Sequence, residues 1–251
     1  MDLIANLSVL DDPPALVSQW LRFYRREGVK RFHIFLNQYL APDSRWEQVL
    51  RLLAAPDVTL VAVYEGVEDM QERVDRFSDY SASELGRRPF VLAADSDEFI
   101  SHPAHAAELM RNSDYDFIPG MLVDRFEVLG RTLPIDEGLD LARAFPLCTH
   151  FTYSALAGSI GKVPLARPGL RYRIGLHSVE NPEGLRSPPW WVPVNHFKWY
   201  EGVVQRLRDR IARDYGGEPY LRQCRCLLEN FVIDGDRIDL SGVASWMRPE
   251  W

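Results

Sequence analysis

Three acidic residues directly follow one strongly apolar segment of the chain. Residues 90–94 are all apolar, and Asp95, Asp97 and Glu98 come soon after them. An unbroken apolar run of this length is typical of a strand buried on both faces of a sheet. In an extended chain, residues i and i+2 point the same way, so Asp95 and Asp97 can present two carboxylates to one point. Clustered carboxylates repel one another unless a cation or hydrogen bonds compensate them, and such hard oxygen ligands suit Mg²⁺ or Mn²⁺.

The same residues also have an ordinary structural interpretation. Asp95 or Ser96 can cap a following helix, and an Asp-x-Asp pair on its own is common in protein sequences. The elements around the motif therefore decide between a polar loop and a metal site.

Apolar periodicity predicts that strands and helices alternate as far as residue 100. Continuous apolar runs predict strands, and apolar residues at i, i+3 and i+4 predict helices with one buried face. The expected strands are 3–10, 30–37, 58–64 and 90–94, and the expected helices are 15–27, 44–55 and 68–85. This order predicts an α/β fold, a mostly parallel sheet flanked by helices, in which ligands bind at the carboxyl ends of the strands.

Beyond residue 100 the alternation stops. We expect helices at 102–112, 200–215 and 219–230, a strand at 116–127, and irregular structure at 130–173, where Gly, Pro and Arg are frequent. Segments of that composition commonly surround a site. No repeat, low-complexity tract or linker divides the sequence, so we expect a single domain over residues 1–251.

The overall composition narrows the function classes. The chain has 251 residues, 46% of them hydrophobic, and a formal net charge of −7, which argues against a nucleic-acid binder. It contains no apolar run as long as a membrane span and no signal peptide, and its three cysteines suit reduced thiols, so a cytoplasmic protein is expected. There is no Gly-x-Gly-x-x-Gly or Walker-type loop, which disfavours dinucleotide redox chemistry and P-loop hydrolysis.

Four blocks of sequence, taken in order, carry a family resemblance. Residues 18–37 begin with Ser-Gln-Trp and end in Asn, residues 90–99 end in Asp-Ser-Asp-Glu-Phe, residues 162–168 are followed by His177-Ser178, and residues 195–197 are Asn-His-Phe. Together they resemble the nucleotide-sugar-dependent glycosyltransferases of GT-A fold, most closely the family-2-like and family-92-like enzymes. The chain departs from the family pattern at Asp11-Asp12, Gln38 and Phe197, which affects the choice of nucleotide and acceptor more than the metal.

The resemblance implies a metal-dependent transfer of one sugar from a nucleoside-diphosphate sugar, such as a UDP- or GDP-sugar. It implies that Asp95, Asp97 and His196 hold Mn²⁺ or Mg²⁺, with residues 1–100 binding the donor. Residues 101–215 would then complete the metal and acceptor side, followed by a C-terminal helix and tail at 216–251. The residues expected to contact the donor are Asn6, Ser8, Asp11, Asn37, Arg73, Arg76, Asp95, Lys162 and His177. The carboxylates considered for proton transfer are Glu98, Asp124 and Glu180.

Several alternatives stay open at this point. His196 can equally be a buried structural histidine, and Arg73 and Arg76 can lie on a solvated helix face. A Mg²⁺-dependent nucleotidyltransferase is the first rival, although residues 6–14 lack the glycine and lysine of a triphosphate loop. A non-catalytic nucleotide- or sugar-binding module of the same fold is the second. The acceptor (glycan, lipid-linked, small molecule or peptide), the stereochemistry, peripheral membrane association and the oligomeric state are open as well.

Overall fold

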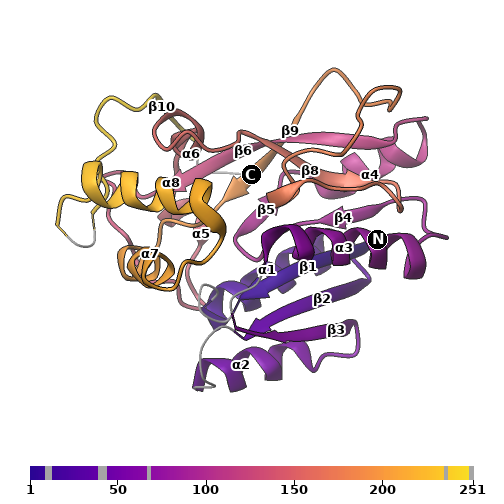
Figure 1. Cartoon of the computed structure of the whole chain (residues 1–251), viewed down its shortest axis with the longest axis horizontal. Coiled ribbons are helices and arrows are strands. Elements are labelled where there is room, and N and C mark those ends of the chain that lie inside the picture. Colours follow the sequence, from indigo (N-terminus) through magenta and orange to yellow (C-terminus); the bar gives the residue numbers. More distant parts are fainter. Residues whose placement is uncertain (9–12, 39–43, 67–68, 235–236, 249–251) are drawn as a thin grey trace.

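The computed structural model describes residues 1–8, 13–38, 44–66, 69–234 and 237–248 (Figure 1). The strands are β1 Asp2–Ser8, β2 Arg31–Gln38, β3 Val58–Glu65, β4 Val91–Ala93, β5 Glu98–Ile100, β6 Phe117–Phe126, β7 Leu147–Thr149, β8 Gly161–Ala166, β9 Val192–His196 and β10 Ser245–Met247. The helices are α1 Pro14–Arg26, α2 Ser44–Leu53, α3 Met70–Glu84, α4 Pro103–Arg111, α5 Leu141–Ala144, α6 Phe151–Ser154, the 3₁₀ turn η1 Ile174–Leu176, α7 Val203–Ala212 and α8 Gly217–Asn230.

The first half of the chain forms the parallel part of the sheet. Strands β3, β2, β1 and β4 lie side by side in this order, and each neighbouring pair is parallel. Parallel neighbours need a crossover, and α1, α2 and α3 supply it. The α/β class and the order of elements predicted for this half are therefore confirmed.

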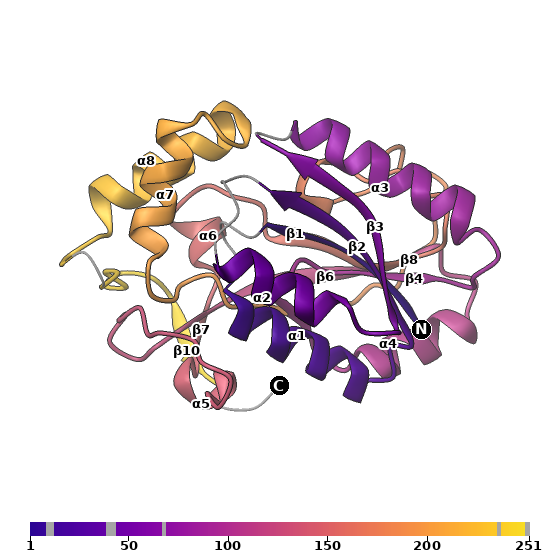
Figure 2. The ribbon, with the colours of Figure 1, turned by 90° about the horizontal axis from the view of Figure 1, so that it is seen from below.

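Alternating residues of β1 show why helices cover both faces of this sheet. Leu3 and Leu7 pack in one core cluster with Trp20 of α1, whereas Ile4 packs in another with Phe77 of α3. Successive residues of a strand point to opposite faces, so this alternation requires apolar cover on both sides. Figure 2 shows α1 and α2 on one side of the sheet and α3 on the other.

The second half continues the sheet with antiparallel pairs. Strand β8 pairs with β4 and β6, and β6 pairs with β7, while β9 runs parallel to β6. The expectation of irregular structure at 130–173 is wrong for β7 and β8, because β8 lies between β4 and β6 in the middle of the sheet. Its Gly-Lys-Val-Pro sequence has no strong periodicity, and pairing on both sides makes it a strand.

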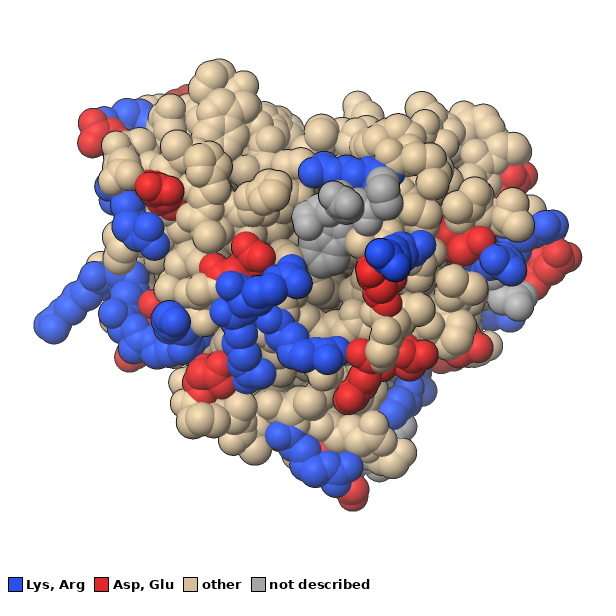
Figure 3. Space-filling view, turned by 180° about the vertical axis from the view of Figure 1, so that it is seen from behind, with Lys and Arg blue, Asp and Glu red and all other residues tan. Residues whose placement is uncertain are grey.

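Two short strands connect the acidic motif to the end of the sheet. In β5 and β9, Glu98 lies opposite His196 and Phe99 lies opposite Asn195. Helices α7 and α8 pack against each other near β9, with Trp199 buried in their cluster. On the face that Figure 3 shows, groups of Lys and Arg side chains have Asp and Glu side chains beside them. No helix in the described part of the chain has the length and apolar character needed to cross a membrane.

Candidate functional site

Polar side chains gather where β1, β2 and β4 end, on the face that α3 covers. Asn6 follows Ile4 by two residues and Asn37 follows Phe35 by two, so both point to the α3 side. Asp95 comes directly after the buried end of β4 and is bound by Arg73 of α3, with 2.7 Å between Nη2 and Oδ1. The structure thus brings Asn6, Asn37, Arg73 and Asp95 to one edge of the sheet.

Two buried amides at this edge have oxygen atoms without a partner. Asn6 is 6% exposed and Asn37 is fully buried, and neither Oδ1 accepts a hydrogen bond within the described structure. A buried polar atom left unpaired is destabilising, so such atoms often mark a place where a ligand or water binds. Ser8 lies at the same edge, in register with Asn37. The predicted contact Asp11 lies outside the described residues.

Arg76 belongs to the same face of α3 but has local partners. Its guanidinium lies 3.9 Å from the ring centroid of Tyr64 and forms an ion pair of 2.9 Å with Glu72. Arg73 and Arg76 therefore cover the ends of β3 and β4, close to the edge at which the sequence analysis placed the donor.

Lys162 is an internal counter-charge for the acidic motif. It is 5% exposed, and its ammonium lies 2.6 Å from Glu98 Oε1 and 3.7 Å from Asp95 Oδ2. It also donates a hydrogen bond of 2.8 Å to the carbonyl of Gly175. An ammonium has three N–H donors, and these three oxygens surround it. The arrangement favours a positioning role for Lys162 over the predicted contact with a diphosphate.

His196 lies between two carboxylates. Its Nδ1 is 2.9 Å from Asp124 Oδ1, and its Nε2 is 3.3 Å from Asp97 Oδ2. Burial alone lowers the pKa of this imidazole, but the charges and hydrogen bonds of Asp97 and Asp124 outweigh burial and raise the pKa to about 9. Burial likewise raises the pKa of Asp97, and the positive charge of His196 overcomes it and holds that pKa below its usual range.

Asp124 is the buried support of this histidine. It is 1% exposed, and besides His196 it accepts hydrogen bonds from the backbone N–H and hydroxyl of Thr152 and from Trp199 Nε1. Burial raises the pKa of Asp124, and these bonds together lower it below its usual range. A carboxylate so enclosed suits the orientation of His196 better than contact with an acceptor. Neither Thr152 nor Trp199 is among the site residues predicted from sequence, because no local sequence signal marks their contact with Asp124.

The pair of Asp97 and His196 fits part of a divalent metal site. An octahedral ion such as Mg²⁺ holds its ligands at about 2.0–2.1 Å, which places neighbouring ligand atoms about 3 Å apart. The 3.3 Å between Asp97 Oδ2 and His196 Nε2 is close to this spacing. With Nδ1–H donated to Asp124, a metal would replace the proton on Nε2, and a carboxylate behind the imidazole is common at metal-bound histidines.

The described residues contain no cluster of three or more His, Cys, Asp or Glu side chains that could hold a metal ion. Asp95, the third ligand expected from sequence, is instead bound by Arg73 and lies near Lys162. A metal held by two protein ligands needs phosphate oxygens and water for its other positions, as is usual for Mg²⁺ at nucleotide sites. Asp97, with a side chain 24% exposed, is open enough for that.

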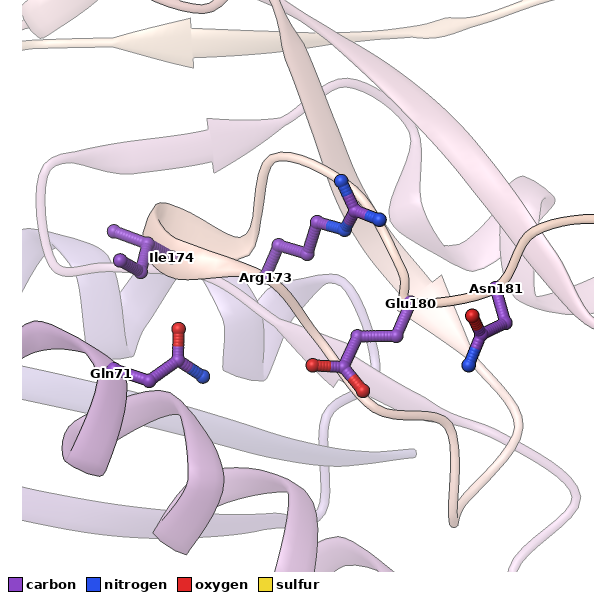
Figure 4. Close-up of a pocket in the computed structure, with 5 residues that line it drawn as sticks. All are labelled: Gln71, Arg173, Ile174, Glu180 and Asn181. Carbon is purple, nitrogen blue, oxygen red and sulfur yellow. The ribbon is translucent and has the colours of Figure 1, made fainter.

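The remaining predicted residues lie on the loop that follows β8. His177 Nδ1 is 2.7 Å from the carbonyl oxygen of Gly161, and burial is the main reason that its pKa falls to about 4. The neutral ring therefore donates to that carbonyl and holds the loop against β8. Glu180 is exposed and lines a hollow together with Gln71 and Arg173 (Figure 4). Glu98, by contrast, is buried and bound to Lys162.

Comparisons with known proteins give weak similarities. No family model matches the sequence, and no curated protein matches it. Among solved structures, the chain is similar to S. aureus TarS (13% identity, TM-score 0.39), covering 88% of this chain and 41% of that one. It is also similar to TarS 1–349 in complex with UDP-GlcNAc (12% identity, TM-score 0.41), covering 88% of this chain and 69% of that one. A third similar structure is a 4-diphosphocytidyl-2C-methyl-D-erythritol synthase (13% identity, TM-score 0.35), with 67% of this chain and 74% of that one covered.

The chain thus spans less than half of that TarS chain. At identities and TM-scores this low, the similarities do not assign an activity. The function has to be argued from the site.

Proposed function

We propose that this protein transfers a sugar from a nucleoside-diphosphate sugar to an acceptor hydroxyl, with a divalent metal held by Asp97 and His196. The observation that carries the proposal is the row from Asp97 through His196 to Asp124, in which one imidazole has a buried carboxylate behind it and a partly exposed carboxylate in front. Asp97 comes just after the carboxyl end of β4, beside the edge of the sheet at which Asn6 and Asn37 lie. Mn²⁺ suits a mixed imidazole and carboxylate site, and Mg²⁺ is the other candidate.

Some site residues would contact the donor, and others would support the metal ligands. Among the described residues the amide oxygens of Asn6 and Asn37 have no hydrogen-bond partner, and they would accept hydrogen bonds from the base or ribose of the donor. Asp124 orients the imidazole of His196 and accepts its Nδ1–H. Lys162 and Arg73 compensate the negative charges of Glu98 and Asp95, which reduces the repulsion among the carboxylates of residues 95–98. When bound, the metal would neutralise charge on the departing diphosphate.

The transfer needs a group that takes the proton of the acceptor hydroxyl. Of the three carboxylates considered, Asp124 and Glu98 are buried and bound, and Glu180 has an exposed side chain without a hydrogen bond or ion pair in the described structure. We assign this role to Glu180. The acceptor oxygen bonds to the sugar carbon, the bond to the diphosphate oxygen breaks with its electron pair, and the proton passes to Glu180.

Calorimetry of UDP and GDP, each with and without Mn²⁺, tests the proposal. We expect one nucleotide to bind only with Mn²⁺, and Asp97→Ala to weaken that binding at least about tenfold, because one of two protein ligands is lost. Asp114→Ala is the matched control, since the Asp114 side chain is 85% exposed.

Two outcomes would count against the proposal. Absence of binding for both nucleotides, or binding indifferent to Mn²⁺ and to the Asp97 substitution, would refute the metal-dependent transferase. Tighter binding of a nucleoside triphosphate than of either diphosphate would favour the nucleotidyltransferase alternative.

A further inference from the structure

A hollow of 460 Å³ lies between the start of α3 and the loop that carries His177. It is lined by Gln71, Arg173, Ile174, Glu180 and Asn181. Figure 4 shows Gln71 and Ile174 on one side and Glu180 and Asn181 on the other, with the Glu180 carboxylate pointing toward the side of Gln71. Ligand pockets commonly span about 300–1,000 Å³, so the hollow is large enough for a small molecule.

The two charged residues that line this hollow do not neutralise each other, because the Arg173 guanidinium and the Glu180 carboxylate point away from each other (Figure 4). Arg173 and Glu180 form no ion pair, and the side chains of Arg173, Glu180 and Asn181 have no hydrogen-bond partner among the described residues. A guanidinium only donates hydrogen bonds, a carboxylate only accepts them, and an amide does both. An anionic ligand would be repelled by Glu180 and a cationic one by Arg173, so the lining favours a neutral ligand that both donates and accepts.

A sugar ring meets these requirements. Its hydroxyl groups donate to the carboxylate and accept from the guanidinium and the amide. Its C–H face can lie against an apolar side chain, and Ile174 is 49% exposed at the edge of the hollow. Neutral pyranoses combine both features in one ligand.

The hollow adjoins the proposed metal and donor site through Lys162. The Gly175 carbonyl oxygen, next to Ile174, lies 2.8 Å from Lys162 Nζ, which lies 3.7 Å from Asp95 Oδ2. These two oxygens are therefore at most 6.5 Å apart, the sum of the two distances. From α3, Gln71 precedes by two residues the Arg73 that binds Asp95. A ring held in the hollow lies beside the acidic motif.

We infer that this hollow binds a neutral pyranose ring, held by Arg173, Glu180 and Asn181. The inference rests on the proposed function, because it names the class of sugar-bearing substrate and the place where it binds. The ring can belong to the acceptor or to the sugar of the donor, and both sources present the same hydroxyl groups to the hollow.

Saturation-transfer NMR of the full chain with methyl glycosides tests the inference. The probes are the methyl pyranosides of glucose, galactose, mannose and N-acetylglucosamine, without nucleotide. We expect at least one glycoside to bind, and Glu180→Ala and Arg173→Ala each to weaken its affinity about tenfold or more, the effect of losing one hydrogen bond to a charged group. Glu183→Ala, an exposed glutamate on the same loop, is the control and should leave the affinity unchanged.

The affinities of UDP and of a UDP-sugar separate the two sources of the ring. If the ring belongs to the donor, Glu180→Ala weakens the UDP-sugar and leaves UDP unchanged. If the ring belongs to the acceptor, Glu180→Ala changes neither the UDP nor the UDP-sugar affinity, while it still weakens glycoside binding. Lack of binding by every glycoside, or a glycoside that binds Glu180→Ala and Arg173→Ala as tightly as the unaltered chain, would overturn the inference. Because the glycoside measurement uses no nucleotide or metal, its failure is distinct from a failure of the proposed transferase.

Discussion

Replacement of Lys162 by Met gives a sharp test of the internal counter-charge. The ammonium is 5% exposed and lies 2.6 Å from Glu98, whose side chain is also 5% exposed. Methionine keeps most of the apolar stem and removes the charge, which leaves a buried carboxylate and the Gly175 carbonyl without their partner. Breaking a buried ion pair by removal of one member costs about 3–5 kcal/mol. We expect Lys162→Met to lose that much in its free energy of unfolding.

Urea denaturation at pH 7.5, followed by tryptophan fluorescence, measures this loss. The double variant Lys162→Met/Glu98→Gln has no buried unpaired charge, so it should be more stable than Lys162→Met by about 2 kcal/mol. Lys30→Met is the matched control, because Lys30 is exposed, and its effect should stay within about 0.5 kcal/mol.

The same variants distinguish a positioning role from contact with the diphosphate. If Lys162 only positions the acidic turn, the double variant should bind nucleotide and Mn²⁺ within about threefold of the unaltered chain, less than 1 kcal/mol. A loss of less than about 1 kcal/mol in Lys162→Met, or equal instability of the single and double variants, would refute the reasoning. A tenfold loss of nucleotide affinity in a stable double variant would restore the diphosphate contact expected from sequence.

Three further predictions concern two supports of the site, Asp124 and His177, and the turn at Gly130. Asp124→Asn should lower the free energy of unfolding by about 2–4 kcal/mol, because an amide cannot accept all the hydrogen bonds that reach this carboxylate. Urea denaturation measures this loss, and a loss under about 1 kcal/mol would contradict the prediction. Burial lowers the pKa of His177 to about 4, so its share of stability is complete above the unfolded pKa of about 6.5 and is lost as pH falls toward 4. A pH series should show about 2 kcal/mol of extra loss between pH 7.5 and 5 that His177→Gln lacks, and equal slopes would count against it. Gly130→Ala should lower the free energy of unfolding by at least about 2 kcal/mol, since φ is +74° and a Cβ would meet the Ile238 carbonyl. The control Gly138→Ala, where only the Asp136 side chain is near, should lower it by less than about 1 kcal/mol. Equal thermal unfolding midpoints for the two variants would disprove this prediction.

The sequence by itself determined most of the first half of the fold. Apolar runs and helical spacing predicted every strand and helix from β1 to β4 to within about two residues, because these elements are buried on a whole face and their local pattern records it. The polar edge follows from the same reasoning, since parallel strands end together. The sequence therefore predicts that Asn37 and Asp95 lie at one edge of the sheet.

Only the tertiary structure decided how the charges of the site are compensated. Lys162 and Glu98 are far apart in the chain, and β8 could be identified as a central strand only from its pairing with β4 and β6. Likewise, nothing near Asp124 in sequence shows that Thr152 and Trp199 enclose its carboxylate. Periodicity records which face of an element is buried, whereas the partner of a buried charge depends on which distant strands become neighbours, and that is set by the packing of the whole sheet.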